Sequence, residues 1–142
     1  MDEIEQPVTE MSVEECWTLL EGHEFGRLAY RLVDEVHLVP INYVVEDRTL
    51  YFRTTSGGKL LAAALHSDVA FEIDWYDDGT AWSVVVRGAL RQLEEDEQHR
   101  LDSVARESWI PTEKPEVVEL VPSAVTGRRF VVRRPQAGNV QC

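Results

Sequence analysis

A polar loop between two apolar runs, Arg53-Thr-Thr-Ser-Gly-Gly-Lys59, contains the residue types that bind phosphate groups. Arg53 and Lys59 supply positive charge, Thr54 and Thr55 supply hydroxyl donors, and the two glycines let backbone N–H groups approach an anion. The Leu- and Ala-rich run that follows favours a short helix, whose N-terminus would strengthen the attraction. The spacing of a Walker loop is absent. The loop therefore predicts a phosphate contact, with a solvated polar turn as the alternative.

Other residues could contribute to a site from neighbouring strands. Pro40 interrupts an apolar run and cannot donate to a sheet ladder, so we expect it at a bulge or an edge where the backbone faces a ligand. Trp82 lies in a second apolar run, where an aromatic side chain is typical of core packing. Arg128 and Arg129 are successive residues of a predicted strand and must point to opposite faces, so one at most reaches a site.

The histidines, cysteines and clustered aspartates do not have the spacing of metal ligands. Asp77 and Asp78 with Gly79 are typical of a hairpin turn and lack the spacing of a calcium loop. We therefore expect no metal site. Cys16 and Cys142 give no disulfide framework, which suits a reducing compartment.

The composition fits one acidic globular domain. The 142 residues carry 14 Lys and Arg against 26 Asp and Glu, which gives a formal net charge of −12. This charge repels nucleic acids and anionic membranes, so neither is expected as a partner. No apolar stretch is long enough to span a membrane, and the acidic N-terminus does not resemble a secretory signal, which favours the cytoplasm. We expect a single domain over 1–142, with 1–10 and 135–142 as flexible tails.

Alternating apolar residues predict a β-rich fold. The segments with the alternation and flanking turn residues of strands are 25–32, 36–45, 49–54, 69–76, 81–93, 117–122 and 127–134. The segments that favour helices are 12–20, which has a capping box at Ser12 and Glu15, then 59–66 and 94–109. Since closure protects strand edges, we predict a mainly β protein: a small antiparallel barrel of six or seven strands with two to three short helices.

Several segments, in their order along the chain, resemble one known family. They are GRLAY (26–30), VPINYVV (39–45), LYFRTTSGGKL (50–60), VAFEID (69–74), WSVVVRGAL (82–90) and TGRRF (126–130). Their order and spacing resemble the FMN-binding split β-barrels related to pyridoxamine 5′-phosphate oxidase. Within that group the chain is most similar to small actinobacterial flavin-binding proteins and to the 5-nitroimidazole reductases.

The resemblance implies a homodimer that holds FMN at the subunit interface. The positions that match the family's flavin contacts are Pro40, Ile41, Asn42, Arg53, Thr54, Thr55, Lys59, Trp82, Ser83 and Arg129. Residues 53–59 would hold the FMN phosphate, mainly through Thr54 and Lys59. The backbone of 40–42 would line the isoalloxazine ring, and the later residues would approach the ring or the ribityl chain.

The implied function is a flavin-dependent oxidoreductase that reduces a small oxidised or nitroaromatic compound with electrons from a nicotinamide or another donor. Backbone N–H groups around Ile41 and Asn42 would stabilise negative charge on the reduced flavin, and no catalytic side chain is identified. The chain lacks the C-terminal substrate-phosphate residues of true pyridoxamine 5′-phosphate oxidases, so that vitamin activity is not expected. The alternatives are a flavin or haem carrier without turnover and a deazaflavin-dependent reductase on the same fold.

Overall fold

The computed structural model describes residues 7–54, 67–93 and 116–132, and the side chains of residues 53, 54 and 116 are not described. Over these ranges the elements are β1 (Val8–Glu10), α1 (Val13–Glu21), β2 (Phe25–Leu32), β3 (Glu35–Glu46), β4 (Thr49–Thr54), β5 (Asp68–Tyr76), β6 (Thr80–Gln92) and β7 (Glu116–Val131). The predicted mainly β fold is confirmed. The helices predicted at 59–66 and 94–109 and the tail at 135–142 lie outside the described residues.

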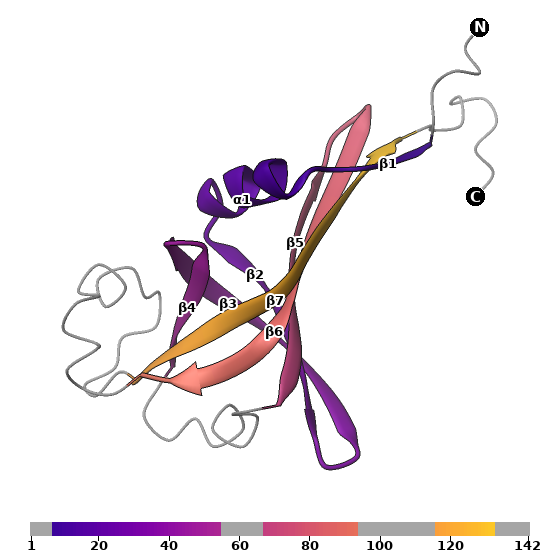
Figure 1. Cartoon of the computed structure of the whole chain (residues 1–142). Coiled ribbons are helices and arrows are strands. Elements are labelled where there is room, and N and C mark those ends of the chain that lie inside the picture. The colour runs from indigo at the N-terminus through magenta and orange to yellow at the C-terminus, as the bar shows by residue number, and fades with distance from the viewer. Residues whose placement is uncertain (1–6, 55–66, 94–115, 133–142) are drawn as a thin grey trace, which may run out of the picture.

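The strands form a ring in which every pairing is antiparallel. The order is β7-β4-β3-β2-β5-β6, and β6 pairs again with β7, while β1 is added to β7 on the outside. Figure 1 shows β6 and β7 as long neighbouring ribbons with α1 across one end of the barrel. In this ring β3 and β6 are opposite each other, with two strands between them on each side.

Helix α1 closes one end of the barrel. Its N-terminus has the capping box expected from the sequence, in which the Ser12 hydroxyl accepts from the Glu15 N–H and the Glu15 carboxylate accepts from the Ser12 N–H. Cys16, Trp17 and Leu20 form its buried face. These side chains join the core cluster, so packing against the barrel supplies the stability that a nine-residue helix lacks alone.

Alternate strand residues fill the interior of the ring. Tyr43 and Phe52 each pack against Phe71, with ring centroids 4.9 Å and 5.4 Å apart. Leu28, Leu50 and Leu120 are fully buried beside them. Because large side chains occupy the interior, a ligand the size of a cofactor must bind outside the barrel or at its ends.

The structure corrects the sequence prediction for the last strand. Residues 117–122 and 127–134 were expected as separate strands, but β7 runs without a break through Glu116–Val131. The intervening residues pair with β6, and an irregularity in the register between Arg87 and Gly88 accommodates Pro122 and Ser123. The Ser123 hydroxyl donates to the Arg87 carbonyl at 3.2 Å, which fixes this bulge.

The N-terminal tail is also shorter than predicted. Val8–Glu10 were included in a flexible tail over 1–10, but they pair with Phe130, Arg129 and Arg128 of β7 as strand β1. The Val131 N–H donates to the Pro7 carbonyl at 3.1 Å, which adds one hydrogen bond beyond the end of the β1–β7 pairing. The open side of β7 is thereby covered over these residues.

No helix among the described residues is long and apolar enough to cross a membrane.

Candidate functional site

The segment Pro40–Asn42 lies at a local edge of the sheet. Pro40 pairs with Arg27 of β2 on one side, whereas the ladder to β4 begins only at Tyr43 and Phe52. Continuing that register brings residues 41–42 beside 53–54, at the point where β4 ends. Within the described residues Pro40 thus has a strand partner on the β2 side alone, as expected for an edge, and the two segments predicted to line a site, 40–42 and 53–54, are neighbours.

The residues of this segment face different directions. Ile41 packs against the core. Pro40 is exposed on the outside of the barrel. Val36 and Leu38 lie on the same side, and each of these two side chains is 68% exposed. We call these three exposed residues the outer β3 face. Asn42 points to the same side as Pro40 but is only 7% exposed. A flat apolar surface therefore ends at a buried amide.

The hydrogen-bond direction of β3 shows which backbone groups face β4. The Tyr43 N–H donates to the Glu24 carbonyl on the β2 side at 2.9 Å. Because N–H groups alternate sides along an antiparallel strand, the Asn42 N–H is directed toward β4, and the Ile41 N–H toward β2. Of the two backbone N–H groups predicted to face a ligand, those of Ile41 and Asn42, the Asn42 N–H is the one that points toward β4.

The later predicted residues lie on β6, which is opposite β3 in the ring, and on β7, which β4 separates from β3. Trp82 is half-buried against the core and meets His23 edge to face, with centroids 5.1 Å apart. Its register partner, Arg129, forms an ion pair with Glu15 of α1 at 3.3 Å. Ser83 pairs with Arg128 on the opposite, outward face.

The structure thus brings Pro40, Ile41, Asn42 and the end of β4 together, and it separates Trp82, Ser83 and Arg129 from them. Thr55 and Lys59 lie outside the described residues. Within one chain, the predicted cofactor-binding residues that the structure describes therefore do not form one site.

A charged cluster that the sequence did not reveal lies on the outside of β2 and β5. Arg27 Nη2 contacts Glu72 Oε1 at 2.5 Å and Asp74 Oδ2 at 2.7 Å. Burial raises the pKa of Glu72, and its hydrogen bond with Asp74 raises it further. The same hydrogen bond, with the help of Arg27, lowers the pKa of Asp74. Of the two carboxyl groups, Asp74 is therefore the more acidic.

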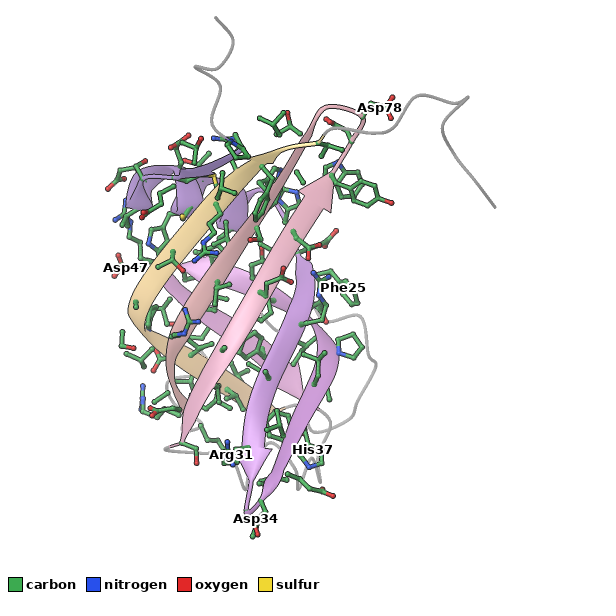
Figure 2. The ribbon with its side chains drawn as sticks, turned by 90° about the vertical axis from the view of Figure 1, so that its right-hand side faces the viewer. Phe25, Arg31, Asp34, His37, Asp47 and Asp78 are labelled. Carbon is green, nitrogen blue, oxygen red and sulfur yellow. The ribbon has the colours of Figure 1, made fainter. Side chains whose placement is uncertain are left out.

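An open pocket of about 920 Å³ lies at the α1 end of the barrel. Its walls come from the connection between α1 and β2, the last residues of β3 and the end of β5. Figure 2 shows Phe25, one of its lining residues, extending outward from the start of β2. The same view places Asp78 at the tip of the β5–β6 hairpin and Asp34 at the opposite end of the barrel.

Comparison with known proteins establishes the family. The sequence profile of the family described as pyridoxamine 5′-phosphate oxidase matches residues 12–129, which is most of the chain. This chain belongs to the pyridoxamine 5′-phosphate oxidase family. The resemblance seen in the sequence segments is therefore confirmed.

Relatives in this family match over most of their length. The FAD binding protein of Mycobacterium smegmatis is 39% identical, with a TM-score of 0.74, and the match covers 87% of this chain and 99% of that one. A conserved protein of unknown function from Corynebacterium diphtheriae is 32% identical, with a TM-score of 0.76 and coverage of 89% and 100%. An uncharacterised protein of Mycobacterium tuberculosis is 30% identical over 131 residues, which cover 87% of this chain and 86% of that protein.

Sequence reasoning on this family member missed the pocket and the Arg27 cluster for different reasons. Trp75 and Tyr76 end an alternating strand and precede a turn, which is a usable signal for exposed aromatics at a strand end. The ion pairs of Arg27 join residues 45 or more positions apart, so they depend on the β2–β5 register, which the sequence pattern alone does not give.

Proposed function

We propose that this protein binds a flavin nucleotide between two copies of the chain and uses it in oxidoreductase chemistry. The observation that carries the proposal is the 39% identity to the FAD binding protein of M. smegmatis over 99% of that chain. Membership of the pyridoxamine 5′-phosphate oxidase family supports the same class of cofactor. FMN is the cofactor that the sequence resemblance implies, and the relative's name makes FAD the second nucleotide to test.

The chemistry of the β3 edge fits a flavin. The outer β3 face is apolar and exposed, which suits contact with a flat aromatic ring. Beside it, β4 ends at Thr54 and the chain enters the polar stretch 55–59. Arg53, Thr54, Thr55 and Lys59 would hold the phosphate through hydrogen bonds strengthened by charge. Ring contacts and phosphate contacts would then come from adjoining segments.

A homodimer accounts for the separation of the predicted residues. Trp82 and Ser83 lie on β6, opposite β3 in the ring with the packed core between, and Arg129 of β7 pairs with Trp82. In the proposed dimer these residues would approach the cofactor from the partner subunit. The outer β3 face supplies exposed apolar surface for such an interface.

The proposed reaction assigns binding and orientation to the chain. When bound, the flavin supplies the capacity to accept a hydride and to pass electrons to a small oxidised or nitroaromatic compound. The Asn42 N–H, directed toward β4, would stabilise negative charge beside the ring. Pro40 offers no N–H and leaves the neighbouring surface apolar, which would exclude water from one face.

The first experiment is an absorbance spectrum of the purified chain, followed by titration of the stripped protein with FMN, FAD, a deazaflavin and haem in parallel. Saturable binding of FMN or FAD supports the proposal and identifies the nucleotide. Saturation by the deazaflavin or haem alone would move the function to that cofactor. An absence of binding to all four would refute a cofactor site.

The phosphate contact is tested by Lys59→Ala. Loss of one hydrogen bond to a charged group should weaken flavin binding by about 1.5 to 3 kcal/mol. Arg31→Ala is the matched control, because it removes one positive charge from an exposed position near the far end of β2. Equal affinities of the two variants would remove Lys59 from the phosphate site.

A test of turnover distinguishes a flavin-dependent oxidoreductase from a flavin carrier that does no chemistry. The flavin-loaded protein is mixed with NADH or NADPH under anaerobic conditions, and a nitroaromatic acceptor is then added. Reduction followed by reoxidation at the rate of acceptor consumption supports an oxidoreductase. Binding without either step supports the carrier.

A further inference from the structure

The pocket at the α1 end of the barrel is lined by exposed aromatic side chains. Phe25 is 42% exposed, Trp75 is 62% exposed and Tyr76 is 68% exposed, and all three line the same pocket. We call them the aromatic wall. Large aromatic rings are normally buried on folding, and rings left exposed around one concavity are typical of a binding site. They provide ring faces for a planar ligand.

The remainder of the lining carries negative charge. Glu21, Glu24 and Glu46 line the pocket, and we call them the acidic rim. All three are exposed, and none forms an ion pair within the part of the chain that the structure describes. The proximity of Glu24 contributes to the raised pKa of Tyr43, whose ring forms part of the pocket wall. The carboxylates therefore act on the pocket itself.

Positive charge in the lining is offset locally. Arg27 lines the pocket, but its guanidinium is held by Glu72 and Asp74 at 2.5 Å and 2.7 Å. The His23 Nδ1 lies 2.8 Å from the Leu19 carbonyl, which can only accept, so that nitrogen is the donor. The described lining has four carboxylates, those of the acidic rim and Asp74, against the guanidinium of Arg27, and the chain as a whole has a formal charge of −12.

We propose that this pocket binds a planar organic cation. The aromatic wall would contact its flat face through cation–π and stacking interactions, and the acidic rim would supply the opposite charge. Phosphates, carboxylates and nicotinamide dinucleotides are excluded as occupants by the same carboxylates. The proposal concerns binding alone, so it stands whether or not a flavin is bound.

The test compares three bicyclic probes of similar size: 1-methylquinolinium as the cation, quinoline as the neutral form and quinoline-6-carboxylate as the anion. Their binding to the full chain is measured by calorimetry at pH 7.5. We expect the cation to bind at least tenfold more tightly than the anion, with quinoline in between. We also expect the preference to shrink at high salt, because screening weakens the acidic rim. Equal affinities for the three probes, or no binding of the cation, would overturn the proposal.

Variants locate the binding to this pocket. Trp75→Ala and Tyr76→Ala should each weaken binding of 1-methylquinolinium about two- to fivefold, and the double variant about tenfold. Val121→Ala is the control, because it removes an exposed apolar side chain of β7 from outside the pocket. Unchanged affinity in the double variant, with the fold verified by circular dichroism, would refute the site.

The charge contribution has its own matched pair. Glu46 and Glu35 are the last and first residues of β3, both are exposed, and only Glu46 lines the pocket. Glu46→Gln should weaken cation binding about twofold or more and reduce its salt dependence, whereas Glu35→Gln should leave both unchanged. Equal effects of the two substitutions would show that the overall charge, not the acidic rim, attracts the cation.

Discussion

Tyr43 illustrates how one side chain joins two elements. It is 2% exposed, and its hydroxyl donates to the Leu20 carbonyl in the last turn of α1 at 2.7 Å. Burial, followed by the nearby Glu24 carboxylate, raises the pKa of Tyr43 well above its usual range. The hydroxyl therefore stays protonated, and holds the helix to β3 as a donor, to a higher pH than an exposed tyrosine would.

Tyr43→Phe should lower the free energy of unfolding by about 1 to 2 kcal/mol, because the Leu20 carbonyl loses its donor in a buried setting. Urea unfolding at neutral pH measures the difference. Tyr76→Phe is the control, since Tyr76 is 68% exposed and should behave as the wild type. A Tyr43→Phe variant as stable as the wild type would show that water replaces the hydroxyl.

Side-chain partners could be predicted from the sequence only where they are close along the chain. Ser12 and Glu15 lie within one helical turn, and their capping box was expected and is present. Arg27 and Glu72 are 45 positions apart, and their contact follows from a register that local patterns do not specify. Distance along the chain, not residue type, decided which contacts could be foreseen.

At the scale of elements, the start of α1 depends on an ionised carboxyl group. The hydrogen bond from the Ser12 backbone and then the contact with Arg129 lower the pKa of Glu15 below its ordinary value of 4.5. A folded pKa below the unfolded one gives stability that is complete above pH 4.5 and is lost as pH falls through the folded value. The helix cap is thus acid-sensitive.

Glu15→Gln should flatten the acid dependence of unfolding, because Gln retains an acceptor for the Ser12 N–H but does not titrate. Chemical unfolding is followed from pH 6 to pH 3 in both proteins. We expect the wild type to lose more stability than the variant below pH 4.5. Parallel curves over this range would contradict a contribution from the Glu15 carboxylate.

The β6–β7 ladder depends on a close approach at Gly88. A Cβ added there would lie 2.1 Å from the Val121 carbonyl oxygen and 2.9 Å from its carbon, so backbone would have to move. Gly88→Ala should therefore destabilise the protein by about 2 to 4 kcal/mol, measured by urea unfolding. At Gly79 nothing lies within 4 Å of the added Cβ, and Gly79→Ala should change stability by about 0.5 kcal/mol or less. Similar losses for both would mean that the ladder adapts.

The bounds of strands that lie between clear turn residues were predicted closely. The bounds of strands whose length depends on pairing with a partner strand were not. The predicted strands at 25–32 and 49–54 have the observed bounds of β2 and β4. Residues 123–127 have the composition of a connection, yet pairing with β6 makes them part of β7. Tertiary pairing overrode local preference where a long partner strand was available.

At the scale of the whole molecule, the outer β3 face is the surface on which the proposed homodimer rests. Val36 and Leu38 expose 68% of their area, and Pro40 lies beside them. In the proposed dimer, the residues of β6 expected at a flavin would meet this edge from the second chain. Oligomeric state and cofactor binding should therefore change together.

Leu38→Glu should convert a dimer into a monomer and weaken flavin binding, because a charge in an apolar interface is costly to desolvate. Sedimentation equilibrium measures the mass, and flavin titration is run on the same samples. Val121→Glu places the same charge on an exposed residue of β7 and should leave the mass unchanged. A Leu38→Glu variant that stays dimeric would move the interface away from this face.

The structure places some of the residues predicted for the site beside one another and leaves the site itself a prediction. Family-matching segments identified the β3 and β4 residues, and these lie together. The sequence could not show that β6 lies opposite β3 in the ring, because the closing pairing joins strands by register rather than by local pattern. The aromatic wall was not predicted, because the exposure of its side chains depends on their position at the end of the barrel, which local sequence patterns do not give.

The many pairings of β7 have a consequence for how the chain is made. Of the described strands β7 comes last in the sequence, and it pairs with β1, β4 and β6. On the ribosome, the edges of β4 and β6 remain uncovered until β7 emerges, and uncovered edges attract other chains. A nascent chain therefore completes its barrel only after residue 131 has left the exit tunnel, and until then chaperone binding would protect it from association.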